Sequence, residues 1–225
     1  MCTVSLIPPV SGRGLRLVCN RDERRTRAAA WAPQLMPRRG VPVLAPVDSE
    51  SLGTWIAVSG AGLIYALLNL HREGSFTPRV PRSSRGHIIP ALAGAFDYRE
   101  VTRQLGLLDL EQFAPHRLLI TDGLDAAVCT WEGARLEWTE EVVRGPILLS
   151  SSCLGDDQAE APRRALFEDL LADETDPWRA QDRLHRHAWP DRRHLSVLMS
   201  RTAAHTVSRT VIVLHDRVAT MAFYR

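Results

Sequence analysis

Short apolar runs separated by turn-forming residues dominate the chain and predict strands that fold back on one another. The runs 3–7 and 15–20 flank a Ser-Gly-Arg-Gly segment, which is typical of a tight turn between antiparallel strands. The runs 54–58 and 63–68 flank a second turn that contains two glycines. Further strands are expected along the chain at 117–121, 126–131, 136–139, 146–150, 206–214 and 217–224.

Helical spacing marks two blocks of the chain. In the first block, the segments 83–95 and 97–106 begin with serine and aspartate, which are residue types that cap helix N-termini. In the second block, the segment 159–172 places its apolar side chains near one face, as an amphipathic helix does. Pro177 stands at the first position of a further helix, where its missing N–H costs nothing.

The stretch 24–50 lacks a clear hydrophobic period. It holds four prolines and seven charged residues, so we predict an irregular loop over the surface. Between residues 21 and 39 there are six arginines and two acids, a local excess of +4. If this loop borders a binding pocket, it would favour carboxylate or phosphate groups on a ligand.

The order of the elements is strands, helices, strands, helices, strands. Hairpin signals favour antiparallel sheets, and helices grouped in blocks argue against a parallel sheet of βαβ units. The predicted fold class is therefore α+β, with two antiparallel sheets faced by helices on their outer sides. The sequence has no Gly-, Ser- or Pro-rich linker at mid-chain and no internal repeat, so one domain over residues 1–225 is expected.

The composition excludes several kinds of chemistry. All 28 basic residues are arginine, so the chain contains no P-loop lysine, Schiff-base lysine or Ser-Lys catalytic pair. The formal net charge of +2 gives no strong field for nucleic acid, and no nucleic-acid partner is expected. His185, His187 and His194 lack regular ligand spacing, so we interpret them as part of a solvated, arginine-rich helix end and expect neither a metal nor a cofactor.

The cysteines and the hydropathy of the chain predict a protein of the cytoplasm. Its four cysteines, at positions 2, 19, 129 and 153, form no C-x-x-C pair, so reduced thiols are expected. The N-terminus lacks the long apolar core of a signal peptide. No stretch reaches the ~20 apolar residues of a membrane span.

Cys2 is the most informative candidate for catalysis. Removal of Met1 would make it the first residue, with its thiol beside a free α-amine. An α-amine titrates near ~8 and a thiol near ~8.5, so a single residue would carry both a nucleophile and a base.

Charged residues follow the second predicted strand, in the segment Asn20-Arg21-Asp22-Glu23. In an antiparallel pair, the end of the second strand lies beside the start of the first. We therefore expect Arg21 and Asp22 to be neighbours of Cys2. The carboxylate of Asp22 would orient the α-amine, and a nearby guanidinium favours a thiolate.

Several motifs together resemble the NRDE family, which is also called the Transport and Golgi organisation protein 2 family. The resemblance spans nearly the whole chain, and its specific parts are the Asn-Arg-Asp-Glu quartet and the later Gly-Thr-Trp. The matching segments are Met1-Cys2-Thr3, Asn20-Arg21-Asp22-Glu23, Gly53-Thr54-Trp55-Ile56, Ser84-Arg85-Gly86, Leu149-Ser150 and Ser208-Arg209-Thr210-Val211-Ile212.

The resemblance implies an N-terminal-nucleophile hydrolase with a four-layer αββα sandwich. Amidases of this type implicate Cys2 as the nucleophile, Asn69 as the oxyanion donor and Arg209 as an arginine near the end of the chain. Arg21 and Asp22 match the pair after the second strand. Their spacing is tighter than in the hydrolases, so either role could fall to Asn20 or Glu23 instead. Because Arg209 lies on an apolar strand, it needs a partner, for which Asp22 and Glu23 are candidates.

One departure from the hydrolase pattern leaves two functions open. A second asparagine of the oxyanion site is expected where this chain has Ser151, and a hydroxyl reaches less far than an amide. The first hypothesis is a cysteine hydrolase that acts on a non-peptide amide or acyl compound. The alternative is a non-catalytic carrier of haem or of acyl-CoA or another lipid on the same scaffold. The sequence indicates no oligomeric state.

Overall fold

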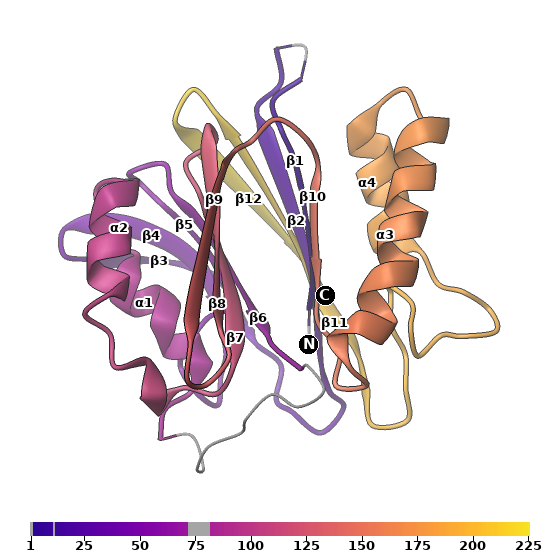
Figure 1. Ribbon diagram of the computed structural model, residues 1–225, viewed down its shortest axis with the longest axis horizontal. Helices are drawn as coiled ribbons and strands as arrows, with labels where there is room; N and C mark the ends of the chain where they lie inside the picture. Colours follow the sequence, from indigo (N-terminus) through magenta and orange to yellow (C-terminus); the bar gives the residue numbers. More distant parts are fainter. Residues whose placement is uncertain (1, 11, 72–81) are drawn as a thin grey trace.

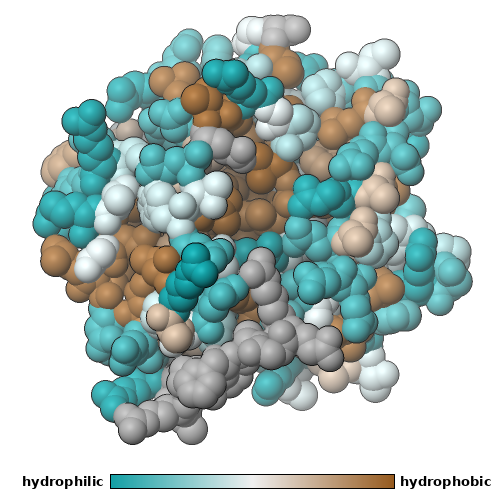
Figure 2. Space-filling model, in the orientation of Figure 1, coloured by the Kyte–Doolittle hydropathy of each residue, from teal (hydrophilic) through white to brown (hydrophobic). Residues whose placement is uncertain are grey.

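Two antiparallel sheets lie face to face at the centre of the molecule, and helices cover the outer face of each sheet (Figure 1). The computed structural model describes residues 2–10, 12–71 and 82–225. The expected α+β fold with an αββα layer order is confirmed. Figure 2 shows that hydrophilic side chains cover much of the surface, while hydrophobic ones reach it near the centre and at the left of this view.

The five-stranded sheet carries both ends of the chain. Its strand order is β10-β1-β2-β11-β12, and each strand is antiparallel to its neighbours. The strands are β1 (Cys2–Ile7), β2 (Leu15–Arg24), β10 (Ile147–Ser150), β11 (Ala204–His215) and β12 (Val218–Tyr224). The predicted hairpin between the first two strands is confirmed, and β1 lies inside the sheet rather than at its edge.

The seven-stranded sheet follows the order of the chain, from β3 to β9, through antiparallel neighbours. Its strands are β3 (Trp31–Arg38), β4 (Val41–Val47), β5 (Ile56–Ser59), β6 (Ile64–Asn69), β7 (His116–Thr121), β8 (Asp125–Trp131) and β9 (Leu136–Val142). The hairpin between β5 and β6 turns through Gly62, whose φ of +83° lies in the left-handed region that favours glycine.

The helices form the two outer layers. The short elements η1 (Arg85–His87), α1 (Ile88–Leu92), α2 (Tyr98–Leu105) and η2 (Leu110–Gln112) follow β6 in sequence, and α3 (Asp156–Asp173) and α4 (Pro177–Arg186) follow β10. The side chain of Asp97 caps α2, as predicted, by accepting a hydrogen bond from the Glu100 N–H. Asp176 caps α4 in the same way, and Pro177 occupies the first turn.

Each face of the five-stranded sheet packs against a different layer. On β1, Cys2, Val4 and Leu6 belong to the core between the two sheets, whereas Ile7 packs against the α3–α4 layer. Between these apolar residues, Thr3 and Ser5 are polar but buried, and the Thr3 hydroxyl accepts a hydrogen bond from Arg163 of α3, so β1 shows the alternation of a strand whose second face meets polar groups of the helical layer. The strand is therefore held from both sides, and the first residues of the chain have a fixed place.

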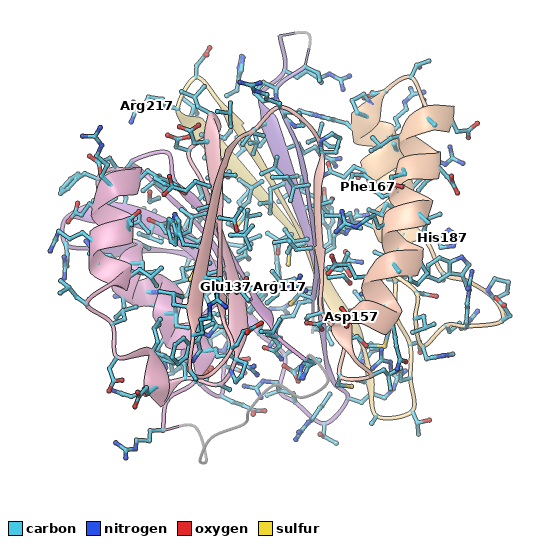
Figure 3. All side chains as sticks on the ribbon, in the orientation of Figure 1. Arg117, Glu137, Asp157, Phe167, His187 and Arg217 are labelled. Carbon is cyan, nitrogen blue, oxygen red and sulfur yellow. The ribbon has the colours of Figure 1, made fainter. Side chains whose placement is uncertain are left out.

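Arg117 connects the two sheets close to the start of β1. Figure 3 shows its side chain in the layer between the sheets. From β7, its guanidinium donates to the carbonyl oxygen of Ser150 and to Glu160, and it lies 3.5 Å from Asp156. These contacts fix the end of β10, which pairs with the first residues of β1.

The prediction of an irregular loop over 24–50 was wrong, because this stretch contains β3 and β4. β3 is the edge strand of its sheet, where prolines such as Pro33 and Pro37 are tolerated and most side chains are exposed. The edge position therefore removed the hydrophobic alternation that would have indicated a strand. β2 also runs on to Arg24, so the charged quartet lies within a strand and not after it.

Candidate active site

The backbone of Cys2 is fixed on both sides. Cys2 pairs with Arg21 of β2, as expected from the hairpin, and Thr3 pairs with Ser150 of β10. The Cys2 nitrogen donates a hydrogen bond of 3.0 Å to Ser151 Oγ, and the Ser151 N–H donates one of 2.9 Å to the Cys2 carbonyl. This nitrogen is the atom that would become the α-amine if Met1 were removed.

A pocket of about 210 Å³ opens in front of Cys2. Its wall brings together parts of the chain that are far apart in sequence. Arg21 and Asp22 come from β2, Asn69 from the end of β6, and Arg85 from η1. Four of the predicted site residues thus border one cavity, namely Cys2, Arg21, Asp22 and Asn69. The side chain of Cys2 itself is buried, with the residue only 5% exposed.

Cys19 lies beside Cys2 on the same sheet face. A hydrogen bond from the Cys19 thiol, opposed by burial, lowers the pKa of Cys2 to about 7; the positive chain terminus and Arg21 also lower this pKa, whereas the charge of Asp22 raises it. The same hydrogen bond, together with burial, raises the pKa of Cys19 well above its ordinary value. The pair therefore keeps a substantial fraction of Cys2 as a thiolate near neutral pH, with the Cys19 thiol as its hydrogen-bond donor.

Replacing Cys19 with alanine is expected to raise the pKa of Cys2 from about 7 towards the ordinary thiol value near ~8.5. At pH 7 the alkylation of Cys2 by iodoacetamide should then slow roughly tenfold, because fewer thiols are ionised. Mass spectrometry of the Cys2 peptide across pH measures this midpoint. Cys19→Ser keeps a hydrogen-bond donor and should retain the low midpoint. A midpoint that stays near the wild-type value in Cys19→Ala would refute the role of Cys19.

The guanidinium of Arg21 is held by aromatic and acidic neighbours. It stacks 4.3 Å from the centre of the Trp55 ring and donates to Asp48 at 2.5 Å and Glu23 at 3.3 Å. Burial would raise the pKa of Asp48, but hydrogen bonds from Arg27 and Ser51 and the charge of Arg21 hold it below its ordinary value. Arg21 is therefore held in a fixed place beside β1.

Asp22 is a buried carboxyl at the edge of the pocket. Its Oδ1 accepts a hydrogen bond of 2.6 Å from Thr206 Oγ1, and the residue is 2% exposed. Burial raises its pKa, although the nearby charge of Arg163 and the Thr206 bond oppose that shift. The carboxyl of Asp22 is thus held in place close to the N-terminal end of β1.

Asn69 ends β6 opposite His116 and lines the pocket. Within the part of the chain that the structure describes, this amide makes no hydrogen bond. A free N–H donor therefore faces the same space as the Cys2 thiol, which is the arrangement that an oxyanion site requires.

Two predicted site residues lie elsewhere. The Asn20 side chain faces α4 and the segment after it, where its Nδ2 donates to the carbonyls of His185 and Val197 at 2.9 and 3.1 Å. Arg209, opposite Asn20 on β11, stacks 4.8 Å from the Tyr224 ring and does not pair with either candidate partner, Asp22 or Glu23. Side-chain alternation along β2 explains the first case, because Asn20 and Arg21 must point to opposite faces.

The prediction of a solvated histidine cluster was wrong for His185. This residue is 1% exposed, and its Nε2 lies 2.7 Å from Ser5 Oγ. His187 is half-buried and His194 is exposed. Among the described residues, no group of three or more His, Cys, Asp or Glu side chains is arranged to hold a metal ion.

Sequence reasoning missed three residues that shape the site. Asp48 lay in the stretch that the sequence assigned to a loop. For Cys19, the only indication in the sequence was its spacing of two residues from Arg21, which places both side chains on one face of β2. Arg85 stood only in a family motif. Alternation along β2 would have found Cys19, whereas Asp48 and Arg85 reach the pocket through long-range folding that no local pattern predicts.

Comparison with known proteins identifies the family of the chain and its fold. The model of the family described as Transport and Golgi organisation 2 matches residues 1–221. No curated protein matches the chain. No helix among the described residues is long and apolar enough to span a membrane.

Several solved structures share the fold at low sequence identity. An N-acylethanolamine-hydrolyzing acid amidase ortholog from Caenorhabditis elegans is 14% identical with a TM-score of 0.60, covering 94% of this chain and 92% of its own. The C2A mutant of a conjugated bile acid hydrolase from Clostridium perfringens is 12% identical with a TM-score of 0.58, covering 100% and 89%. Penicillin V acylase from Agrobacterium tumefaciens is 12% identical with a TM-score of 0.52, covering 99% and 85%.

Proposed function

The chain belongs to the Transport and Golgi organisation 2 family, and we propose that it is an N-terminal cysteine hydrolase of a small, non-peptide amide. The observation that carries the proposal is the position of Cys2, whose thiol faces a pocket lined by Arg21, Asp22 and Asn69. Three structural neighbours are named as an amidase, a bile acid hydrolase and a penicillin acylase. These names support C–N bond cleavage as the reaction class.

The first step is attack by the Cys2 sulfur on the amide carbonyl. After removal of Met1, the Cys2 nitrogen is an α-amine held by Ser151 Oγ, and it takes up the thiol proton. The Cys19 hydrogen bond and the Arg21 charge favour the thiolate. The carbonyl oxygen becomes an oxyanion as the S–C bond forms, and the Asn69 amide donates to it.

The second step releases the two products. The α-ammonium returns its proton to the leaving nitrogen, the C–N bond breaks, and the acyl group remains on Cys2 as a thioester. A water molecule then attacks the thioester with the α-amine as base. The carboxylic acid leaves, and the Cys2 thiol is restored.

We assign Ser151 a role different from the oxyanion donor that the family pattern suggests. Its Oγ accepts a hydrogen bond of 3.0 Å from the Cys2 nitrogen, so the hydroxyl faces the atom that acts as the general base in the proposed reaction. A hydroxyl there accepts from the α-amine and fixes its lone pair towards the thiol. The substitution of asparagine by serine at this position is therefore compatible with amide hydrolysis.

A panel of small amides tests the proposal. We expect cleavage of at least one among N-acyl amino acids, penicillin V and acyl-homoserine lactones, with release of the free amine detected by mass spectrometry. The pocket volume of about 210 Å³ lies below the ~300–1,000 Å³ of sites for drug-sized ligands, which favours the smaller members of the panel. A protein with a free, alkylatable N-terminal Cys2 that cleaves none of them would contradict the proposal.

Replacing Asn69 with alanine is expected to lower kcat by about 10²–10³-fold, the scale for loss of one oxyanion donor. KM should change less, because the hydrogen bond strengthens only as the oxyanion forms. Steady-state kinetics on the best substrate of the panel measures the change. Unaltered iodoacetamide labelling of Cys2 in the variant is the control for an intact pocket. Equal kcat values in the two proteins would exclude Asn69 from the reaction.

A carrier of haem or acyl-CoA is the second candidate function. The arginines that line the pocket, Arg21, Arg27 and Arg85, support an anionic ligand such as a haem propionate or an acyl-CoA phosphate. Titration of the Cys2→Ala variant with haem and with acyl-CoA, followed by absorbance and calorimetry, tests this function. Saturable binding without any amide turnover by the wild type would favour the carrier. Absence of saturable binding would exclude it.

We expect the protein to work in a reducing compartment such as the cytoplasm. All four cysteines are free, although Cys2 and Cys19 lie close enough for a thiol–thiol hydrogen bond. The proposed reaction needs Cys2 as a thiolate, and reducing conditions preserve that form.

A further inference from the structure

Arg85 is held in a defined position in the wall of the Cys2 pocket. Its NH1 donates 2.9 Å to the Pro115 carbonyl, and Ser84 caps the short helix that carries it. The Gly86 carbonyl accepts a hydrogen bond of 2.9 Å from Thr54 N. A Cβ on Gly53 would lie 2.5 Å from the carbonyl carbon of Gly86, so only glycine permits this close approach. The backbone on either side of Arg85, at Ser84 and Gly86, is thus fixed.

The charges of the pocket leave Arg85 without a counterion. Arg21 and Arg27 share the carboxylates of Asp48 and Glu23. By contrast, Arg85 makes no ion pair with any residue in the described ranges. Its Nε and its second terminal nitrogen are left as donors on the side not used by Pro115.

The surroundings of Arg85 make an anion favourable there. Burial lowers the pKa of Arg85, while the charges of Cys2 and Glu23 act in the opposite direction. A guanidinium that is partly removed from water and has no fixed carboxylate gains from a ligand that supplies one. The Nε–NH2 edge of a guanidinium fits a carboxylate with two parallel hydrogen bonds.

We propose that Arg85 binds a carboxylate of the substrate and so selects small amides that carry a free carboxylate close to the scissile bond. This inference rests on the proposed amide hydrolysis for the identity of the ligand. An N-acyl α-amino acid has the required shape, because its carboxylate is separated from the amide carbonyl by only the nitrogen and the α-carbon. A pocket of about 210 Å³ holds both groups within one small volume.

The first test needs no turnover. Iodoacetate and iodoacetamide alkylate the same thiol, but only iodoacetate carries a carboxylate. In Arg85→Gln, the ratio of the iodoacetate rate to the iodoacetamide rate at Cys2 should fall about tenfold relative to wild type at low salt. Arg82→Gln is the matched control, because Arg82 is exposed three residues earlier and does not line the pocket. Arg85→Lys keeps the charge and should keep most of the ratio.

The second test uses paired substrates, an N-acylglycine and the corresponding N-acylglycinamide. Wild type should favour the free acid in kcat/KM, and Arg85→Gln should lose about tenfold or more of that preference. If no amide is cleaved but the alkylation ratio falls, the anion site stands and the proposed hydrolysis fails. If amides are cleaved while both ratios in Arg85→Gln match the wild type, the role of Arg85 is overturned and the hydrolysis stands.

Discussion

Replacing Cys2 with alanine is expected to reduce amide turnover by about 10⁶-fold, which is the scale for loss of a catalytic nucleophile. The reason is that Cys2 carries the only thiol among the described residues that line the pocket. Cys19 lies next to Cys2 but has a pKa raised well above its ordinary value, so it remains a protonated thiol. Activity is measured as amine release from the best substrate of the panel.

Two features make this comparison specific. Alanine at position 2 is as small as cysteine for the enzyme that removes Met1, so the processing of the terminus should be preserved. Cys129→Ala is the matched control, because Cys129 is a buried cysteine of β8 that packs in the outer core of the other sheet. Turnover that persists in Cys2→Ala, or that is lost equally in Cys129→Ala, would remove Cys2 from the mechanism.

Blocking the α-amine of Cys2 is expected to lower turnover by about 10²–10⁴-fold, the contribution typical of a general base. A form with an N-terminal tag that can be cut off to leave Cys2 first allows the same preparation to be assayed before and after cleavage. An extended chain has only an amide nitrogen at this place, and an amide nitrogen cannot accept the thiol proton. Activity should therefore appear only when the tag is removed.

A steric explanation must be separated from the chemical one. Iodoacetamide labelling of Cys2 in the uncut form reports whether the pocket is still open. Labelling together with missing turnover would support the α-amine as the base. Equal turnover before and after cleavage would show that the thiol works without a free terminus.

The sequence predicted the fold and the centre of the site where local rules apply. A glycine-containing turn between two apolar runs sets the β1–β2 hairpin, and the hairpin places Cys2 opposite Arg21. Asn69, at the end of a predicted strand, was assigned from the family resemblance rather than from a local rule. The layer order followed from hairpins and helices that occur in blocks.

The remaining features depend on interactions that local patterns do not carry. The proline-containing edge strand β3 has too few buried side chains to show alternation. Asp48 and Arg85 reach the pocket only through the packing of the second sheet and its loops. The role of Ser151 required the geometry itself, because the sequence could not show that its hydroxyl faces the Cys2 nitrogen.

Detection of the acyl-enzyme tests the central claim most directly. The processed protein is mixed with its substrate, quenched in acid within the first turnovers, and digested for mass spectrometry. The account predicts a thioester-linked acyl group on the peptide that begins with Cys2, absent from the Cys2→Ala variant. Amide cleavage with an unmodified Cys2, or with the acyl group on another residue, would contradict it.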